Sequence, residues 1–91
     1  MVEYTIIFSK QADKDKKLLK QAGLEDKTIS LLDIISVNPY QSPPFYERLR
    51  GNLSGYFSRR ISLQHRLVYE VDETTKEIFV VRMWTHYDDV R

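Results

Sequence analysis

The alternation of apolar and polar positions predicts a strand and two helices in the first half of the chain. Residues 4–8 are β-branched and aromatic, which is typical of a strand. Ser9 can then cap a helix that runs to about Ala22, with Gly23 as its stop. A second helix is expected from about residue 25 to Asn38-Pro39. The side chains expected to be buried are Ala12, Leu18, Leu19 and Ala22 in the first helix and Ile29, Leu31, Leu32, Ile34 and Ile35 in the second.

The second half of the chain has the pattern of a loop followed by three strands. The segment 40–46 contains Pro43-Pro44 and is expected to be a loop. The strand candidates are 56–62, 65–71 and 76–85, and a turn at 72–75 joins the last two. Residues 67–69 and 78–81 are apolar on both parities, so they predict central strands that are covered on both sides.

Together these elements predict an α+β fold. The order is β-α-α-β-β-β, and the short connections between the late strands favour antiparallel pairing. We expect a small antiparallel sheet with the two N-terminal helices packed on one face.

Chain length and composition limit the number of domains and the cellular compartment that we expect. A chain of 91 residues can enclose one hydrophobic core, so residues 1–91 are expected to form a single domain. No apolar run approaches the roughly 20 residues that cross a bilayer, so no membrane association is expected. With no cysteine and no visible secretion signal, the sequence favours the cytoplasm.

Charge is unevenly distributed along the chain. The net charge is only +1. Between Glu47 and Arg66, however, five arginines face one acid, which gives +4 locally. This arginine-rich middle is the kind of segment that contacts phosphate.

The candidate chemistry is acid–base chemistry rather than cofactor chemistry. Two histidines 21 positions apart without cysteine are a poor basis for a zinc site, and no glycine-rich phosphate loop occurs. We therefore expect no metal and no cofactor. RNA cleavage without metal needs a base for the ribose 2′-hydroxyl, cations for the phosphorane and an acid for the leaving 5′-oxygen. Glu47, the arginines and His86 have the side chains for these roles.

Four segments carry a resemblance to a known family. They are Asn38-Pro39-Tyr40-Gln41-Ser42-Pro43-Pro44-Phe45-Tyr46-Glu47, Asn52-Leu53-Ser54-Gly55-Tyr56-Phe57-Ser58-Arg59-Arg60-Ile61, His65-Arg66-Leu67-Val68-Tyr69 and Arg82-Met83-Trp84-Thr85-His86-Tyr87. In this order they resemble the YoeB/Txe family of the RelE superfamily. The resemblance covers nearly the whole chain.

The resemblance implies a set of site residues. Glu47 matches the family's general base, Arg66 its phosphate-stabilising arginine and His86 its general acid. Arg50, Arg60 and Tyr87 match substrate-binding positions. Four residues follow Tyr87, whereas some members of the family end there.

The resemblance also implies an activity and partners. It implies a metal-independent endoribonuclease, the toxin of a type II toxin–antitoxin system, that cleaves mRNA in the ribosomal A site and inhibits translation. The partners would be the ribosome, mRNA and a YefM/Axe-like antitoxin, with operator DNA bound only through the antitoxin. The sequence leaves monomer and homodimer open.

Several alternatives stay open from the sequence. A non-catalytic ParE-type toxin acting on DNA gyrase shares the general fold, and a plain RNA-binding module is a further alternative. Arg59 can be structural or face rRNA, Arg66 can pair with Glu70 on its own strand, and His65 is expected to be structural. The lysines of the first helix are either a solvated face or an rRNA contact.

Overall fold

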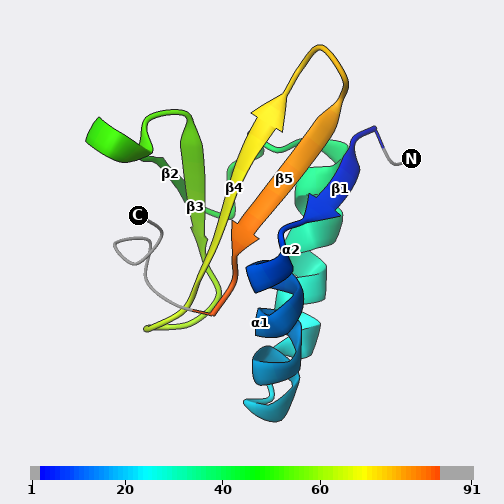
Figure 1. Cartoon of the computed structure of the whole chain (residues 1–91), viewed down its shortest axis with the longest axis vertical. Coiled ribbons are helices and arrows are strands. Elements are labelled where there is room, and N and C mark those ends of the chain that lie inside the picture. The colour runs from blue at the N-terminus through cyan, green and yellow to red at the C-terminus, as the bar shows by residue number, and fades with distance from the viewer. Residues whose placement is uncertain (1–2, 85–91) are drawn as a thin grey trace.

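A computed structural model describes residues 3–84 and shows two helices beside a twisted sheet (Figure 1). The elements in chain order are β1 (Thr5–Phe8), α1 (Lys10–Gln21), α2 (Glu25–Val37), β2 (Tyr46–Arg48), the short 3₁₀-helix η1 (Gly51–Leu53), β3 (Tyr56–Arg60), β4 (Arg66–Asp72) and β5 (Glu77–Arg82).

The five strands form one sheet in the order β1-β5-β4-β3-β2. All neighbours are antiparallel except β1, which runs parallel to β5. The predicted α+β class and the placement of three late strands are confirmed. The sequence does not predict β2, because its proline-rich pattern extends the expected loop to Tyr46. Its three residues have no apolar alternation, and they form a strand because they pair with β3.

Local signals place the helix ends where the sequence predicts them. The Ser9 side chain accepts a hydrogen bond from the Ala12 N–H at 3.0 Å, so it caps α1. Gly23 follows the helix with a φ of +75°, a conformation that favours glycine. The helix α2 begins at Glu25 and is capped at its C-terminus by Asn38.

The main core lies between the helices and one face of the sheet. Leu19 and Ile35 pack there against Leu67, Tyr69 and residues of β5. A second cluster of Leu49, Leu53 and Val68 covers the other side of β4. This central strand is therefore covered on both faces, as the sequence predicts.

Some expected core positions of the helices are wrong. Ile29 is 48% exposed and Leu18 is 36% exposed, whereas Asp15 is fully buried. The Asp15 carboxylate accepts hydrogen bonds from Arg82 Nε at 3.1 Å and from the Met83 N–H at 2.9 Å. These bonds offset the desolvation cost of the buried carboxylate. They also connect α1 to the end of β5.

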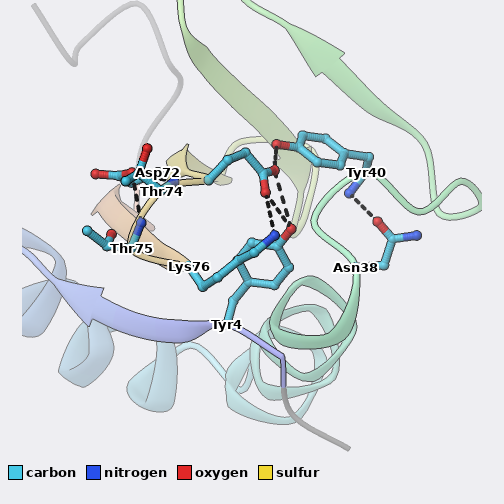
Figure 2. A network of polar contacts seen from close by, with 8 residues as sticks. Tyr4, Asn38, Tyr40, Asp72, Thr74, Thr75 and Lys76 are labelled. Atoms are coloured by element: carbon cyan, nitrogen blue, oxygen red, sulfur yellow. Dashed lines mark hydrogen bonds and ion pairs between the residues drawn. The ribbon is translucent and has the colours of Figure 1, made fainter.

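A polar network ties three distant segments together at the opposite end of the sheet (Figure 2). The Glu73 carboxylate, in the β4–β5 turn, accepts hydrogen bonds from Tyr4 at 2.9 Å and from Tyr40. Lys76 forms an ion pair with the same carboxylate at 3.0 Å. The network thus anchors the start of the loop between α2 and β2, which leads to the residues of the candidate site. Neither helix within residues 3–84 is long and apolar enough to cross a membrane.

Candidate functional site

Strand register brings four polar residues to one face of the sheet. Glu47 of β2 lies opposite Ser58 of β3, and Arg60 of β3 lies opposite Arg66 of β4. Directly paired residues share a face, and so do residues two apart on one strand. Glu47, Ser58, Arg60 and Arg66 therefore share the face of Val68, on the side of the second cluster.

These four side chains line one pocket of about 470 Å³. Its other lining residues in the described part of the chain are Lys27 and Leu31 of α2 and Pro44 and Phe45 of the loop before β2. Because α2 contributes, the pocket lies at the sheet edge where β2 begins rather than wholly on one face. The pocket brings together Glu47, Arg60 and Arg66, three of the site residues expected from the sequence.

The other expected site residues are not brought into this pocket by the structure. Arg50 is exposed beside η1 and is absent from the lining residues within 3–84. His86 and Tyr87 lie outside the described residues.

The chemistry of the pocket favours an anion that accepts hydrogen bonds. Among its lining residues between 3 and 84, three cations (Lys27, Arg60 and Arg66) stand against one carboxylate, Glu47. Ser58 Oγ and Arg66 Nε are buried there without a hydrogen-bond partner in residues 3–84. Buried polar atoms are normally paired, so these two atoms keep a hydrogen-bonding capacity that residues 3–84 do not use. Within the same range Arg66 makes no ion pair with Glu70.

Arg59 points away from this pocket and is structural. It is only 1% exposed, which removes the alternative of rRNA contact. Its guanidinium donates hydrogen bonds to the carbonyls of Pro39, Gln41 and Pro44 at 3.1, 2.8 and 2.8 Å. It also donates to the Tyr69 hydroxyl at 3.0 Å. Arg59 thereby fixes the loop that ends at Phe45 and leads into β2, which carries Glu47.

His65 packs as a structural residue, but it is not the satisfied histidine that the sequence predicts, because its buried Nδ1 has no hydrogen-bond partner among residues 3–84. Its ring stacks on Trp84 with a centroid separation of 3.9 Å. Burial lowers the pKa of His65, although the charge of Asp15 opposes that shift, so the neutral ring is favoured at neutral pH.

Sequence reasoning did not include Lys27 and Phe45 in the site. Lys27 looks like an ordinary exposed helix residue, and Phe45 like part of a proline-rich loop. They come together only in the folded chain, where both line the same pocket. The signal that was available for Phe45 is a large aromatic residue in a segment with no apolar pattern.

Comparison with known proteins identifies the family of the chain. The family model for the YoeB-like toxin of bacterial type II toxin-antitoxin systems matches residues 8–87. The chain belongs to this family. Among curated relatives of this YoeB-like toxin, Toxin YoeB of Synechocystis sp. is 38% identical over 73 residues, covering 80% of this chain and 76% of the relative. Toxin YoeB of Escherichia coli K12 is 35% identical over 75 residues, covering 82% and 80%.

Solved structures of relatives agree with the fold of this YoeB-like toxin. The chain in the YoeB-YefM complex from Staphylococcus aureus is 38% identical with a TM-score of 0.77, and the match covers 92% of this chain and 98% of that one. The YoeB/ParE toxin from Agrobacterium tumefaciens is 26% identical with a TM-score of 0.83, covering 91% and 99%. The protein is therefore a YoeB-type toxin of a toxin–antitoxin system.

Proposed function

We propose that this YoeB-like toxin is a metal-independent endoribonuclease that cleaves mRNA in the ribosomal A site and so stops translation. The observation that carries the proposal is the pocket that Glu47, Arg60 and Arg66 line together with Ser58, whose Oγ, like Arg66 Nε, has no hydrogen-bond partner among residues 3–84. A carboxylate can accept the proton of a ribose 2′-hydroxyl, and the cations beside it can bind the phosphodiester and stabilise its developing charge. Membership of the YoeB-like toxins supports the same conclusion.

The proposed reaction is attack by the ribose 2′-hydroxyl on the adjacent phosphorus. Glu47 accepts the proton of that hydroxyl while the new oxygen–phosphorus bond forms. Arg66 donates hydrogen bonds to the charged phosphorane, and Arg60 stabilises the same charge. His86 donates a proton to the 5′-oxygen as the phosphorus–oxygen bond breaks. The products are a 2′,3′-cyclic phosphate and a 5′-hydroxyl end.

Two further residues contact substrate in this proposal. Arg50 binds the RNA backbone from outside the pocket, and Tyr87 contacts the nucleotide by stacking or hydrogen bonding. Both assignments rest on their match to positions of the YoeB/Txe pattern. Arginine at position 50 suits forked contacts with a phosphate, because its planar guanidinium presents paired donors.

The proposed partner of this toxin is a YefM/Axe-like antitoxin. One related structure is named as a heterotetrameric complex of YoeB-YefM toxin-antitoxin and another as a YoeB dimer, both from Staphylococcus aureus. We extend both kinds of assembly to this chain, with operator DNA bound only through the antitoxin. Action on ribosomes places the toxin in the cytoplasm.

A ParE-type action on DNA gyrase is the second candidate. The name of the Agrobacterium tumefaciens relative, YoeB/ParE toxin, is the observation that favours it. A gyrase supercoiling assay with the purified toxin tests this alternative directly. The joint presence of Glu47 and Arg66 in one pocket supports the nuclease instead, because a protein that only binds gyrase has no need of them.

The deciding experiment is cell-free translation of a defined mRNA followed by primer extension. The toxin is stripped of metal with EDTA and desalted before it meets the ribosomes. We expect primer-extension stops that mark new 5′ ends within the A-site codon. Glu47→Gln should slow cleavage by roughly 10²–10⁴-fold, the range for a lost acid–base group. The matched control is Glu70→Gln, since Glu70 lies on the same sheet face but does not line the pocket.

Two outcomes would contradict this proposal. One is the absence of A-site cleavage by the stripped protein when metal-supplemented protein cleaves. The other is equal cleavage by Glu47→Gln and Glu70→Gln.

A further inference from the structure

Phe45 presents its ring to solvent at the edge of the pocket. The residue is 76% exposed, although an aromatic side chain usually gains by burial. It lines the same pocket as Glu47 and Arg66. An exposed aromatic ring beside cationic side chains is the arrangement by which proteins stack the bases of single-stranded nucleic acid.

The backbone on both sides of Phe45 is fixed. The Pro44 carbonyl accepts a hydrogen bond from Arg59 Nη1 at 2.8 Å, and Tyr46 is paired with Arg59 in the sheet. The ring of Tyr46 also lies 4.8 Å from the Arg59 guanidinium. Little backbone entropy is therefore lost when a flat ligand covers the Phe45 ring, which favours binding.

Lys27 supplies a cation to the same pocket from α2. Its side chain is exposed, and it lines the pocket together with Phe45 and Arg60. A nucleotide has a flat base and a charged phosphate, so an aromatic ring and an ammonium group in one pocket match both of its parts. A protein partner that covered Phe45 would instead have to desolvate Lys27, Arg60 and Arg66, which is costly without matching acids.

We propose that Phe45 and Lys27 form a nucleotide subsite next to the reacting phosphate. A base of single-stranded RNA stacks on Phe45, and the phosphate attached to that nucleotide binds Lys27. The proposal rests on the proposed function, because it takes RNA as the ligand of the pocket. It makes Phe45 and Lys27 binding residues that hold the RNA strand in place while Glu47 and Arg66 act on the neighbouring bond.

The test uses ribosomes programmed with mRNA that carries 2-aminopurine at single positions in and around the A-site codon. A 2′-O-methyl group at the cleaved nucleotide removes the attacking hydroxyl, so the bound state persists. The fluorescence of 2-aminopurine is quenched when the base stacks on an aromatic ring. We expect the wild-type toxin to quench one position.

The variants separate stacking from other effects. Phe45→Ala should lose that quenching and bind about 5- to 100-fold more weakly, the range for one lost base stack, whereas Phe45→Trp should retain both. Leu63→Ala is the matched control, because Leu63 is 85% exposed and absent from the pocket lining within residues 3–84. Lys27→Gln should lower the slope of log affinity against log salt concentration by about 0.7, the value for one phosphate contact on a single strand.

Each result decides for or against the subsite. Unchanged quenching by Phe45→Ala, or no quenching at any position by the wild type, overturns it. An equal loss of ribosome binding by Phe45→Ala with and without mRNA also overturns it and assigns the ring to a ribosomal surface. Quenching that depends on Phe45, without cleavage of unmodified mRNA, supports the subsite and contradicts the nuclease. Cleavage with normal KM by Phe45→Ala supports the nuclease and contradicts the subsite.

Discussion

Replacement of Arg59 by alanine should destabilise the protein strongly, because this buried guanidinium makes four hydrogen bonds. Each bond from a charged donor is worth about 1.5–3 kcal/mol, but the four bonds are not additive and water can enter the space left by the side chain. Loss of one member of a buried charged network costs about 3–5 kcal/mol. We expect a loss in this range for Arg59→Ala, which is a large part of the roughly 5–15 kcal/mol that stabilises an ordinary domain.

Urea unfolding followed by far-ultraviolet circular dichroism measures this loss. With a slope of about 1 kcal/mol per M for a small domain, the midpoint should fall by roughly 3–5 M. The matched control is the neighbouring Arg60→Ala, whose side chain is exposed and which should change the free energy of unfolding by less than about 0.5 kcal/mol. A loss below about 1 kcal/mol for Arg59→Ala, or equal losses for the two variants, would refute the structural role of Arg59.

Four further predictions concern other residues. Asp15→Ala should lower the free energy of unfolding by about 3 kcal/mol, because it leaves the Arg82 side chain and the Met83 N–H without their acceptor; thermal unfolding beside the exposed control Asp13→Ala checks it. Hydrogen bonds from Tyr40, Lys76 and Tyr4 lower the pKa of Glu73 from 4.5 to about 2. Wild-type stability should therefore fall as pH drops from about 4.5 to about 2, and Glu73→Gln should flatten that fall in acid titrations of the unfolding midpoint. Arg66→Ala should reduce A-site cleavage by roughly 100-fold with an unchanged unfolding midpoint; equal losses from Arg66→Ala and Arg50→Ala would remove its special role. His86→Gln should reduce cleavage by about 10²–10⁴-fold with nearly normal ribosome binding, and a fully toxic variant would contradict its assignment as the acid.

Much of the fold is predictable because its signals are local. A serine cap and a glycine stop define α1, and β-branched and aromatic residues mark the late strands. Burial of Asp15 is not predictable in this way, because its partners lie in the last strand, far along the chain. The strand β2 was missed for a similar reason, since Tyr46-Glu47-Arg48 has no apolar alternation and depends on β3 for its hydrogen bonds.

Some residues of the candidate site are likewise predictable from the sequence, and others are not. Alternation along β3 places Ser58 and Arg60 on one face from the sequence alone, and the resemblance points to Glu47 and Arg66. Neither strand alternation nor the resemblance points to Lys27 or Phe45. They come from a helix and a loop that contribute to the same pocket only after α2 has packed against the sheet.

The parallel pairing of β1 with β5 has a consequence for synthesis of the protein. Thr5 is paired with Glu77 and Phe8 with Val80, so almost the whole chain separates the partners. The translating ribosome adds about 5–20 residues per second and holds the newest residues in its exit tunnel. The edge strand β1 therefore emerges seconds before its partner and stays unpaired until β5 emerges. The pairing of segments that lie far apart in the sequence is slow, and the finished sheet forms only after β5 has emerged. A nascent toxin cannot reach its folded state while its own message is still being translated through the region that encodes β5.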